Sequence, residues 1–104
     1  SDFPVEDVSP LRGLYAARTR QDAQGKPEGG WRPAERLSGE QALHAFTSGA
    51  AYAAFAEGER GVLKPGMDAD FTVLSVDPVD APARDLLEAK VLLTVIGGEV
   101  VYPR

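Results

Sequence analysis

The 104-residue chain carries eleven Lys and Arg against sixteen Asp and Glu, a net charge of −5, and 43% of its residues are hydrophobic. This composition is typical of one globular domain, and the negative charge argues against nucleic acid or an anionic membrane as a partner. The absence of cysteine excludes a disulfide framework, a thiolate zinc site and a cysteine nucleophile. No apolar run approaches the roughly 18 residues of a membrane-spanning helix.

The first predicted element is a helix from Pro10 to about Arg20. Ser9 stands at the N-cap position, Pro10 follows at the first helical position, and apolar residues recur at helical spacing. The next stretch, Gln21–Pro33, is rich in Gly, Pro and charge and is predicted to be an irregular loop. It is long for a simple connector, and Trp31 is its one large apolar side chain.

A stronger helix is predicted to begin at Ser38. The sequence SGEQ has the S-x-x-Q form of a capping box, and apolar residues with many alanines follow at helical spacing. Gly49 interrupts this pattern, which predicts a break or kink there and then a short helix through Tyr52 and Phe55.

The second half of the chain changes to a strand pattern. A turn is predicted at Lys64–Gly66, followed by a strand of alternating apolar residues over 71–76. Lys90–Tyr102 is predicted to be a hairpin, because two β-branched runs flank Gly97 and Gly98, a pair that tolerates positive φ. The result is one sheet of three or four strands, whose outer edges need partners.

Four stretches of the chain carry a family resemblance. GVLKPGMDADFTVL, Gly61–Leu74, is similar to the G-x-L-x-P-G-x-x-A-D-x-x-V-L motif of metal-dependent amidohydrolases, and KVLLTVIGGEVVY, Lys90–Tyr102, is similar to their closing hairpin. SDFPVE, Ser1–Glu6, resembles the end of the last barrel strand, where this family places an aspartate. SPLRGLYAARTR, Ser9–Arg20, together with the GGW loop, resembles the branch of N-substituted formamide deformylase-like proteins. The resemblance spans essentially the whole chain in the family's order.

The resemblance implies an α+β fragment, the last β/α part of a (β/α)8 barrel followed by the C-terminal strands of a small β-sandwich. Residues 1–56 would form the end of the barrel, with the catalytic aspartate, its loop and its helices. Residues 57–104 would form the C-terminal part of the sandwich, which this family builds from both chain ends. We therefore expect a C-terminal fragment that lacks the segment completing the sandwich.

Asp2 is the residue to which the resemblance gives a catalytic role. In this family, histidines and an aspartate at the C-terminal ends of barrel strands hold one or two divalent metals, commonly zinc. The metal lowers the pKa of a bound water, and the aspartate contacts the metal, takes the proton and passes it to the leaving nitrogen. Without the resemblance, Asp2 would be interpreted as a solvated carboxylate near a terminus, because one carboxylate is no motif.

The histidines of such a site are not found in this sequence. His44, the single histidine, falls in the middle of a predicted helix and is given no role, because a protein metal site needs at least three ligands. We therefore expect no metal bound to this chain by itself. Asp68 and Asp70 look like a metal pair, but their family counterpart is structural, and Asp70 is predicted to accept backbone N–H groups at a turn.

Two further residues are weaker candidates for substrate binding. Glu6 either contacts substrate or is a solvated carboxylate in the stretch after the aspartate. Trp31 either contributes to a substrate lid or wall formed by the Gln21–Pro33 loop, or anchors that loop to the barrel. Arg18 and Arg20 either bind an anionic substrate group or are ordinary charges at a helix C-terminus.

The sequence therefore predicts the C-terminal portion of a metal-dependent hydrolase that cleaves a non-peptide C–N bond in a small-molecule amide, formamide or cyclic amide. The fragment is expected to be inactive by itself, and the longer protein to be cytoplasmic. The alternative is a small non-enzymatic interaction domain that forms a homo-oligomer through exposed sheet edges. This alternative accounts for the small size and the single histidine, but not for barrel-like elements followed by sandwich-like elements.

Overall fold

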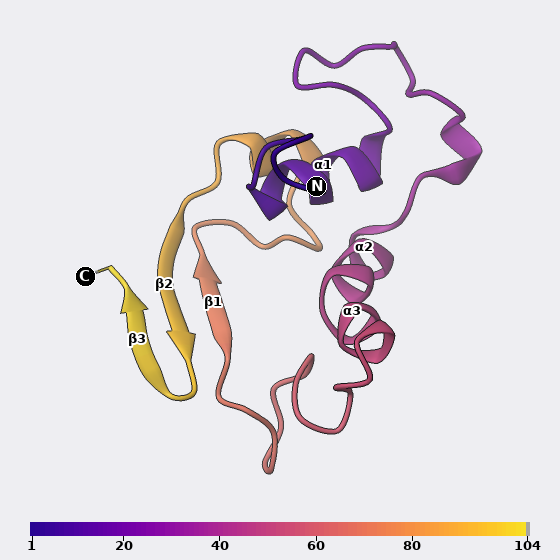
Figure 1. The fold of residues 1–104 in the computed structure, drawn as a ribbon. Coiled ribbons are helices and arrows are strands. Elements are labelled where there is room, and N and C mark those ends of the chain that lie inside the picture. The colour runs from indigo at the N-terminus through magenta and orange to yellow at the C-terminus, as the bar shows by residue number, and fades with distance from the viewer. Residues whose placement is uncertain (104) are drawn as a thin grey trace. The chain divides into compact units, whose positions relative to one another are not determined.

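The computed structural model describes residues 1–103, which divide into two compact units. The first unit consists of Ser1–Leu43 and Val76–Ala89, and the second of His44–Ser75 together with the stretch that begins at Lys90. As predicted, the α-helices precede the strands along the chain (Figure 1). The architecture is a small α+β structure with one three-stranded antiparallel sheet.

Helix α1 (Pro10–Thr19) is the main helix of the first unit and confirms the first predicted helix. It packs against a 3₁₀ helix, η2 (Ala83–Leu87), whose Leu86 is fully buried (Figure 1). Three buried side chains form the apolar face of α1: Leu11, Leu14 and Tyr15. The core of this unit therefore joins residues more than 60 positions apart in the sequence.

The start of α1 differs from the prediction in one respect. Ser9 occupies the N-cap position, but its side chain makes no capping hydrogen bond. Its backbone N–H instead donates to Oδ1 of Asp7 at 3.0 Å. Asp7 also lies 3.4 Å from the guanidinium of Arg12, so an aspartate two residues before the cap position links the helix start to its first turn.

Helix α2 (Gly39–Phe46) begins with the capping box that the sequence predicts. The backbone N–H of Gln41 donates to Oγ of Ser38 at 3.1 Å, and the backbone N–H of Ser38 donates to Oε1 of Gln41 at 2.9 Å. Gly39 lies so close to the backbone of Val79 that a side chain there would overlap the Val79 carbonyl. The helix therefore starts where a glycine permits close backbone contact within the first unit.

Helix α3 (Ser48–Ala53) lies in the second unit, and its bounds correct the sequence prediction. The break falls at Thr47, whose φ of −123° and ψ of −96° are not helical, whereas Gly49 lies inside α3. Gly61 packs its backbone against Thr47, Ser48 and Ala51. This tertiary contact places the helix break two residues before Gly49, because packing overrides local propensity.

The sequence predicts a short helix that includes Phe55. In the structure Phe55 lies beyond the end of α3. Its φ of +57° places it in the left-handed region, which ends a right-handed helix. The side chain is 94% exposed.

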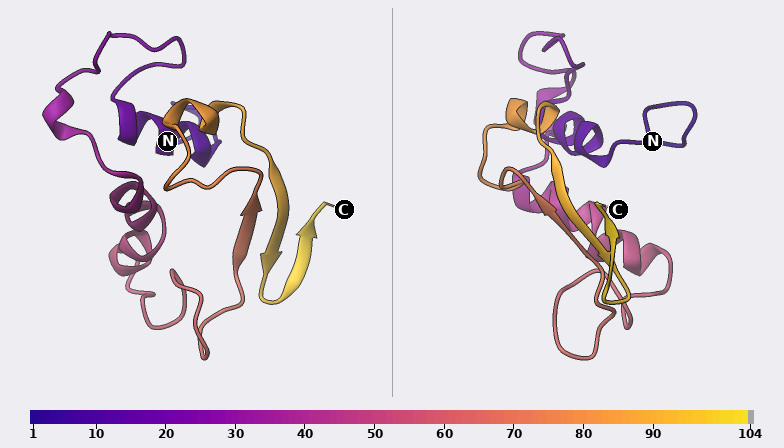
Figure 2. Two further views of the ribbon diagram at one scale, coloured as in Figure 1. Left: turned by 180° about the vertical axis from the view of Figure 1, so that it is seen from behind. Right: turned by 90° about the vertical axis from the view of Figure 1, so that its left-hand side faces the viewer.

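The sheet of the second unit consists of β1 (Phe71–Leu74), β2 (Val91–Ile96) and β3 (Glu99–Tyr102) in the order β1-β2-β3. Both pairings are antiparallel, and Figure 2 shows the three strands side by side from two further directions. The predicted turn at Gly97 and Gly98 is confirmed, with φ of +58° and +82°. The predicted turn at Lys64–Gly66 is also present, since the N–H of Met67 donates to the Lys64 carbonyl at 3.2 Å.

Strand β1 is two residues shorter than the predicted strand over 71–76. Its register with β2 shifts between Val73 and Leu74. Beyond that irregularity, the N–H of Ser75 donates to the Lys90 carbonyl at 2.9 Å, and the N–H of Lys90 donates to Oγ of Ser75 at 2.8 Å. A side-chain hydroxyl thus replaces a regular ladder bond at the end of the strand.

Apolar side chains lie on both faces of this sheet. Val95 is buried and pairs across the sheet with Phe71, so these two share one face. Leu92 and Ile96 lie on the other face of β2, because side chains alternate along a strand, and they are 52% and 57% exposed. A sheet with one face in water alternates apolar and polar residues, whereas this pattern is typical of a sheet covered on both faces.

Candidate functional site

Asp2 lies in a tight turn at the start of the first unit. The N–H of Val5 donates to the Asp2 carbonyl at 2.9 Å, and the N–H of Glu6 donates to the Ser1 carbonyl at 3.3 Å. The φ of Asp2 is +50°, in the left-handed region that non-glycine residues adopt at a cost of order 1 kcal/mol or more. Its side chain is exposed, and no ion pair or hydrogen bond joins the carboxylate to the rest of residues 1–103.

Glu6 is exposed in the same short segment, and its carboxylate likewise has no partner within the described part of the chain. The structure therefore places the two carboxylates within one turn-forming segment just before α1. Each carboxylate is therefore free to accept a hydrogen bond.

The predicted loop over Gln21–Pro33 is irregular, as expected, and it is closed by backbone hydrogen bonds at its base. The N–H of Trp31 donates to the Arg20 carbonyl at 2.9 Å, and the N–H of Leu37 donates to the Ala17 carbonyl at 2.9 Å. A short 3₁₀ helix, η1 (Pro33–Glu35), lies between these two closures. The loop thus returns to the C-terminal end of α1, from which it started.

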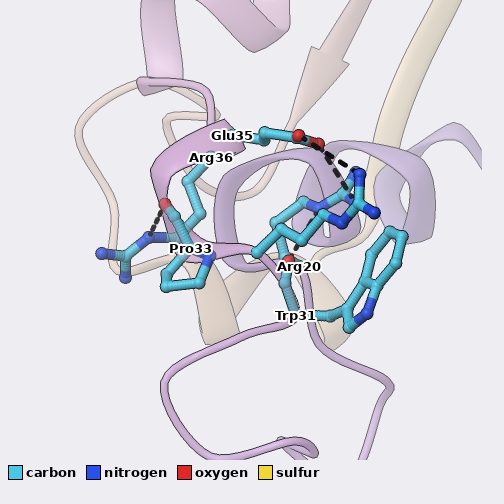
Figure 3. Close-up of polar contacts among 6 residues, drawn as sticks. Arg20, Trp31, Pro33, Glu35 and Arg36 are labelled. Carbon is cyan, nitrogen blue, oxygen red and sulfur yellow. Dashed lines mark hydrogen bonds and ion pairs between the residues drawn. The ribbon is translucent and has the colours of Figure 1, made fainter.

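Trp31 stands among charged side chains at the end of this loop (Figure 3). The guanidinium carbons of Arg20 and Arg32 lie 4.9 Å and 4.7 Å from the centre of its ring, within the range of a cation–π contact. Glu35 lies 3.6 Å from Arg20 and 3.7 Å from Arg32. Trp31 is nevertheless 57% exposed, so it fixes the loop through the arginines while leaving part of its ring open.

Arg18 is occupied by backbone carbonyls within the first unit. Its Nη1 donates to the Pro78 carbonyl at 3.0 Å and its Nη2 donates to the Ala81 carbonyl at 2.8 Å. Arg20 is also occupied, because its Nε donates to the Trp31 carbonyl at 3.1 Å. In this structure both arginines hold parts of the first unit together, which favours a structural role over binding an anionic substrate group.

The turn that Arg18 binds also contains Asp77, whose carboxyl group has a lowered pKa. Backbone N–H groups of Val79 and Asp80 donate to Oδ1 of Asp77 at 2.8 Å and 3.1 Å. These hydrogen bonds, aided by the positive charge of Arg18, lower the pKa of Asp77 below its usual value. Asp77 therefore stabilises its turn in the ionised form.

Asp70 accepts a backbone N–H, as predicted. The donor is not in a turn beside Asp70 but in the hairpin turn between β2 and β3. The N–H of Gly97 donates to its Oδ1 at 2.7 Å, and the N–H of Gly98 donates to the neighbouring Ala69 carbonyl at 3.0 Å. Asp70 therefore holds the hairpin turn of the second unit. Asp68 has a different partner, Arg60, at 3.8 Å.

Potential metal ligands are spread apart within the described part of the chain. Within residues 1–103, no three His, Cys, Asp or Glu side chains are grouped so that they could hold a metal ion. His44 lies in α2, near Gly49, where a side chain would meet the His44 carbonyl oxygen at 3.0 Å and its ring at 3.3 Å. His44 is exposed on α2, and that it has no ligand role stays a prediction.

The sequence-predicted site residues fall into two groups within the first unit. Asp2 and Glu6 precede α1, whereas Trp31 belongs to the loop that follows it. The ten residues of α1 span about 15 Å, and no ion pair or hydrogen bond in the described chain links the two groups. The structure therefore supports two candidate surfaces, a carboxylate segment and a loop.

Sequence reasoning did not identify the side chains that shape the loop. Asp22 Oδ1 accepts the N–H groups of Gln24 and Lys26, both at 2.9 Å, and the Tyr15 hydroxyl donates to the Asp22 carbonyl at 2.9 Å. An aspartate followed within a few residues by glycine is a local turn signal that predicts the first two contacts. The contact with Tyr15 carries no such signal, because it depends on how the helix and loop pack.

Comparison with known proteins decides the family. The model of the amidohydrolase family matches residues 1–102. The chain belongs to the amidohydrolase family. The predicted family is thereby confirmed. In the part of the chain that the structure describes, no helix is both long enough and apolar enough to cross a membrane.

Curated relatives share the sequence over its whole length. The chain is 42% identical to Protein LONG AFTER FAR-RED 3 of Arabidopsis thaliana over 103 residues, which cover 99% of this chain and 17% of that protein. It is 39% identical to the putative amidohydrolase YtcJ of Bacillus subtilis (strain 168), covering 100% of this chain and 20% of that protein. It is 33% identical to the N-substituted formamide deformylase of Arthrobacter pascens, covering 100% of this chain and 19% of that protein.

The chain spans about a fifth of the length of these relatives. No solved structure matches it.

Proposed function

We propose that this chain is the C-terminal portion of a metal-dependent hydrolase that cleaves a non-peptide C–N bond in a small-molecule amide, formamide or cyclic amide. The observation that carries this proposal is the amidohydrolase family match over residues 1–102. The relative named N-substituted formamide deformylase makes N-substituted formamides the first substrates to test. The 104 residues alone are inactive under this proposal, because they supply one part of the site.

The exposed apolar surface supports a role within a larger fold. The chain exposes 7460 Å², whereas a compact monomer of 11.1 kDa exposes about 5,700 Å². Even two separate compact bodies of half that mass would together expose about 6,800 Å². Within residues 1–103, fifteen large apolar side chains are exposed and seven apolar residues are buried. This number of exposed large apolar side chains supports a surface that another part of a protein covers.

The proposed arrangement follows the order of the elements. Residues 1–56 form the end of a (β/α)8 barrel, and residues 57–104 form the C-terminal part of a small β-sandwich. The apolar residues on both faces of the β1-β2-β3 sheet support the second assignment, since a sandwich strand is covered on at least one face. Helix α1 and the start of α2, which lie in the first unit, support the first.

Asp2 is the proposed catalytic residue of this chain. Its carboxylate is exposed and has no partner within residues 1–103, so it is available to accept a proton and to pass it to the leaving nitrogen. In the longer protein Asp2 would also be one ligand of a divalent metal, proposed to be zinc. The other ligands must lie outside these residues, because the described chain holds no further group of donors around it. When bound, such a metal supplies a water of lowered pKa.

Glu6 and Trp31 are the proposed contacts to substrate. Glu6 lies in the same turn-forming segment as Asp2, which supports its placement beside the reacting group. Trp31 keeps more than half of its side chain exposed although two arginines contact its ring, which supports a role at a pocket wall. A cytoplasmic location for the longer protein stays a prediction.

The experiment uses the longer protein and a panel of N-substituted formamides, simple amides and cyclic amides, with release of amine or ring-opened product as the readout. We expect turnover of at least one class, loss of turnover after dialysis against a chelator, and recovery when zinc is added. The purified 104-residue chain with added zinc should give no turnover. Turnover by that chain, abolished by Asp2→Asn, would contradict the proposed division of the site.

The second candidate function is a small interaction domain that self-associates through sheet edges. It is favoured by one observation: among residues 1–103, the outer edges of β1 and β3 have no neighbouring strand. Light scattering on the purified chain separates the two proposals. A stable dimer of the chain together with an inactive longer protein would favour the interaction domain, whereas an active longer protein would rule it out as the main function.

A further inference from the structure

The loop over Gln21–Pro33 is anchored to the end of α1 by contacts between Arg20, which precedes the loop, and Trp31, near the end of the loop. Arg20 donates its backbone N–H to the Ala16 carbonyl at 2.7 Å and accepts the N–H of Trp31 at 2.9 Å. The Arg20 side chain then donates Nε to the Trp31 carbonyl at 3.1 Å. Arg20 and Trp31 are thus joined in both directions, by one backbone bond and one side-chain bond.

The tip of the loop is closed by its own side chains. Gln21, which is half-buried, donates Nε2 to the Gly25 carbonyl at 3.0 Å and to the Pro27 carbonyl at 3.1 Å. Asp22 accepts two backbone N–H groups from the far side of the tip, and its own N–H donates to the Lys26 carbonyl at 2.7 Å. A compact surface loop with close ends and internal side-chain bonds is an Ω-type loop, a class that is frequently functional.

We propose that this loop is a preformed wall of the substrate pocket rather than a lid, and that Gln21 is the positioning residue that holds its shape. A lid needs hinge residues that absorb a change in φ and ψ. The residue at the first hinge position, Arg20, is held by three hydrogen bonds. The tip cannot open without breaking both bonds of the Gln21 side chain.

The wall sets the size of the substituent that fits beside the amide. Trp31 lies at the end of the wall, with its carbonyl and N–H bound to Arg20 and its ring beside two guanidinium groups. A ring held in this way presents a fixed apolar surface, which suits an alkyl or aryl group on the amide nitrogen. This inference rests on the proposed function for the role of the pocket, but not for the rigidity of the loop.

The first test measures amide hydrogen exchange of the loop in the longer protein, without substrate. A wall predicts slowed exchange at the bonded amides of Gly25, Lys26, Gly30 and Trp31. Gln21→Ala should speed exchange at the tip by at least about fivefold, the factor expected for the loss of its two side-chain hydrogen bonds. The matched control is Gln24→Ala, because the Gln24 side chain is exposed and makes no hydrogen bond within the described chain. Loop amides that exchange as in an unfolded chain would overturn the inference.

The second test measures KM and kcat for N-substituted formamides of increasing substituent size. Gln21→Ala should raise KM for the larger substituents by about two- to tenfold and leave kcat within about twofold, because the loop binds substrate without taking part in the reaction. Arg84→Ala should change neither, because Arg84 lies outside the loop, is exposed and has no partner within the described chain. A change in kcat alone, or an unchanged KM despite faster amide exchange, would contradict the proposal that the loop is a wall of the substrate pocket. A longer protein that hydrolyses none of the panel would defeat the proposed function while the exchange result still decides the rigidity of the loop.

Discussion

Arg18 and Asp77 act on one turn of the first unit, and neither role follows from local sequence. Arg18 donates to the carbonyls of Pro78 and Ala81, which lie 60 and 63 residues further along the chain. Asp77 accepts two backbone N–H groups from the same turn. A charge at the end of a helix is normally explained by the helix dipole, so the sequence alone could not identify a partner that only the fold brings near.

Replacing Arg18 by Met should destabilise the first unit. The change leaves two carbonyls without their charged donor, and a hydrogen bond to a charged group contributes about 1.5–3 kcal/mol. We expect a loss of about 2 kcal/mol in the free energy of unfolding, measured by chemical denaturation of the longer protein. Arg84→Met is the matched control, because Arg84 is exposed and has no partner within the described chain. Equal effects of the two substitutions would contradict the role given to Arg18.

The lowered pKa of Asp77 predicts how stability depends on pH. A group whose pKa is lower in the folded than in the unfolded chain stabilises the fold above its unfolded pKa. That stabilisation is lost as the pH falls through the folded pKa. The Asp77 carboxyl carbon should therefore titrate below the usual aspartate range in an NMR titration, and Asp77→Asn should flatten the acid limb of a plot of thermal midpoint against pH. A carboxyl that titrates at its usual value would contradict this account.

At the scale of elements, the sequence predicts that a helix or strand is present better than it predicts the residues at which that element begins and ends. The capping box at Ser38 and Gln41 and the Gly97-Gly98 turn are local patterns with one structural solution, and both are confirmed. The break between α2 and α3 was placed at Gly49 and lies at Thr47. Gly61, fourteen residues beyond Thr47, packs against this break, and no local pattern contains that information.

Gly61 supplies a test of this contact. Its φ is +102°, and a Cβ there would lie 2.8 Å from the Ala51 Cβ and 2.9 Å from the Ser48 Cα. Gly61→Ala should therefore lower the free energy of unfolding by at least about 1–3 kcal/mol, from backbone strain together with the clash. Gly58→Ala is the matched control, because Gly58 has open space around it and no positive φ. A neutral Gly61→Ala, measured by denaturation alongside Gly58→Ala, would contradict the packing described for α3.

At the scale of the whole molecule, the sequence patterns lead to the family but not to the complete site. Motif order predicts an amidohydrolase, and the family match confirms it. The candidate site stays partial, because Asp2 has no metal-binding neighbours in the described chain and the loop with Trp31 lies beyond the other end of α1. The apolar residues on both sheet faces, together with the share of each relative that the chain covers, favour completion by further chain.

The most direct test of the central proposal is the hydrolase activity of the longer protein with Asp2→Asn. Loss of a carboxylate that moves a proton costs about 10²- to 10⁴-fold in rate. We expect a fall in kcat of at least about 100-fold with an unchanged circular dichroism spectrum, and less than about a twofold change for the exposed control Asp80→Asn. A variant Asp2→Asn that retains full kcat on the same amide substrate would contradict the assignment of Asp2 to the active site.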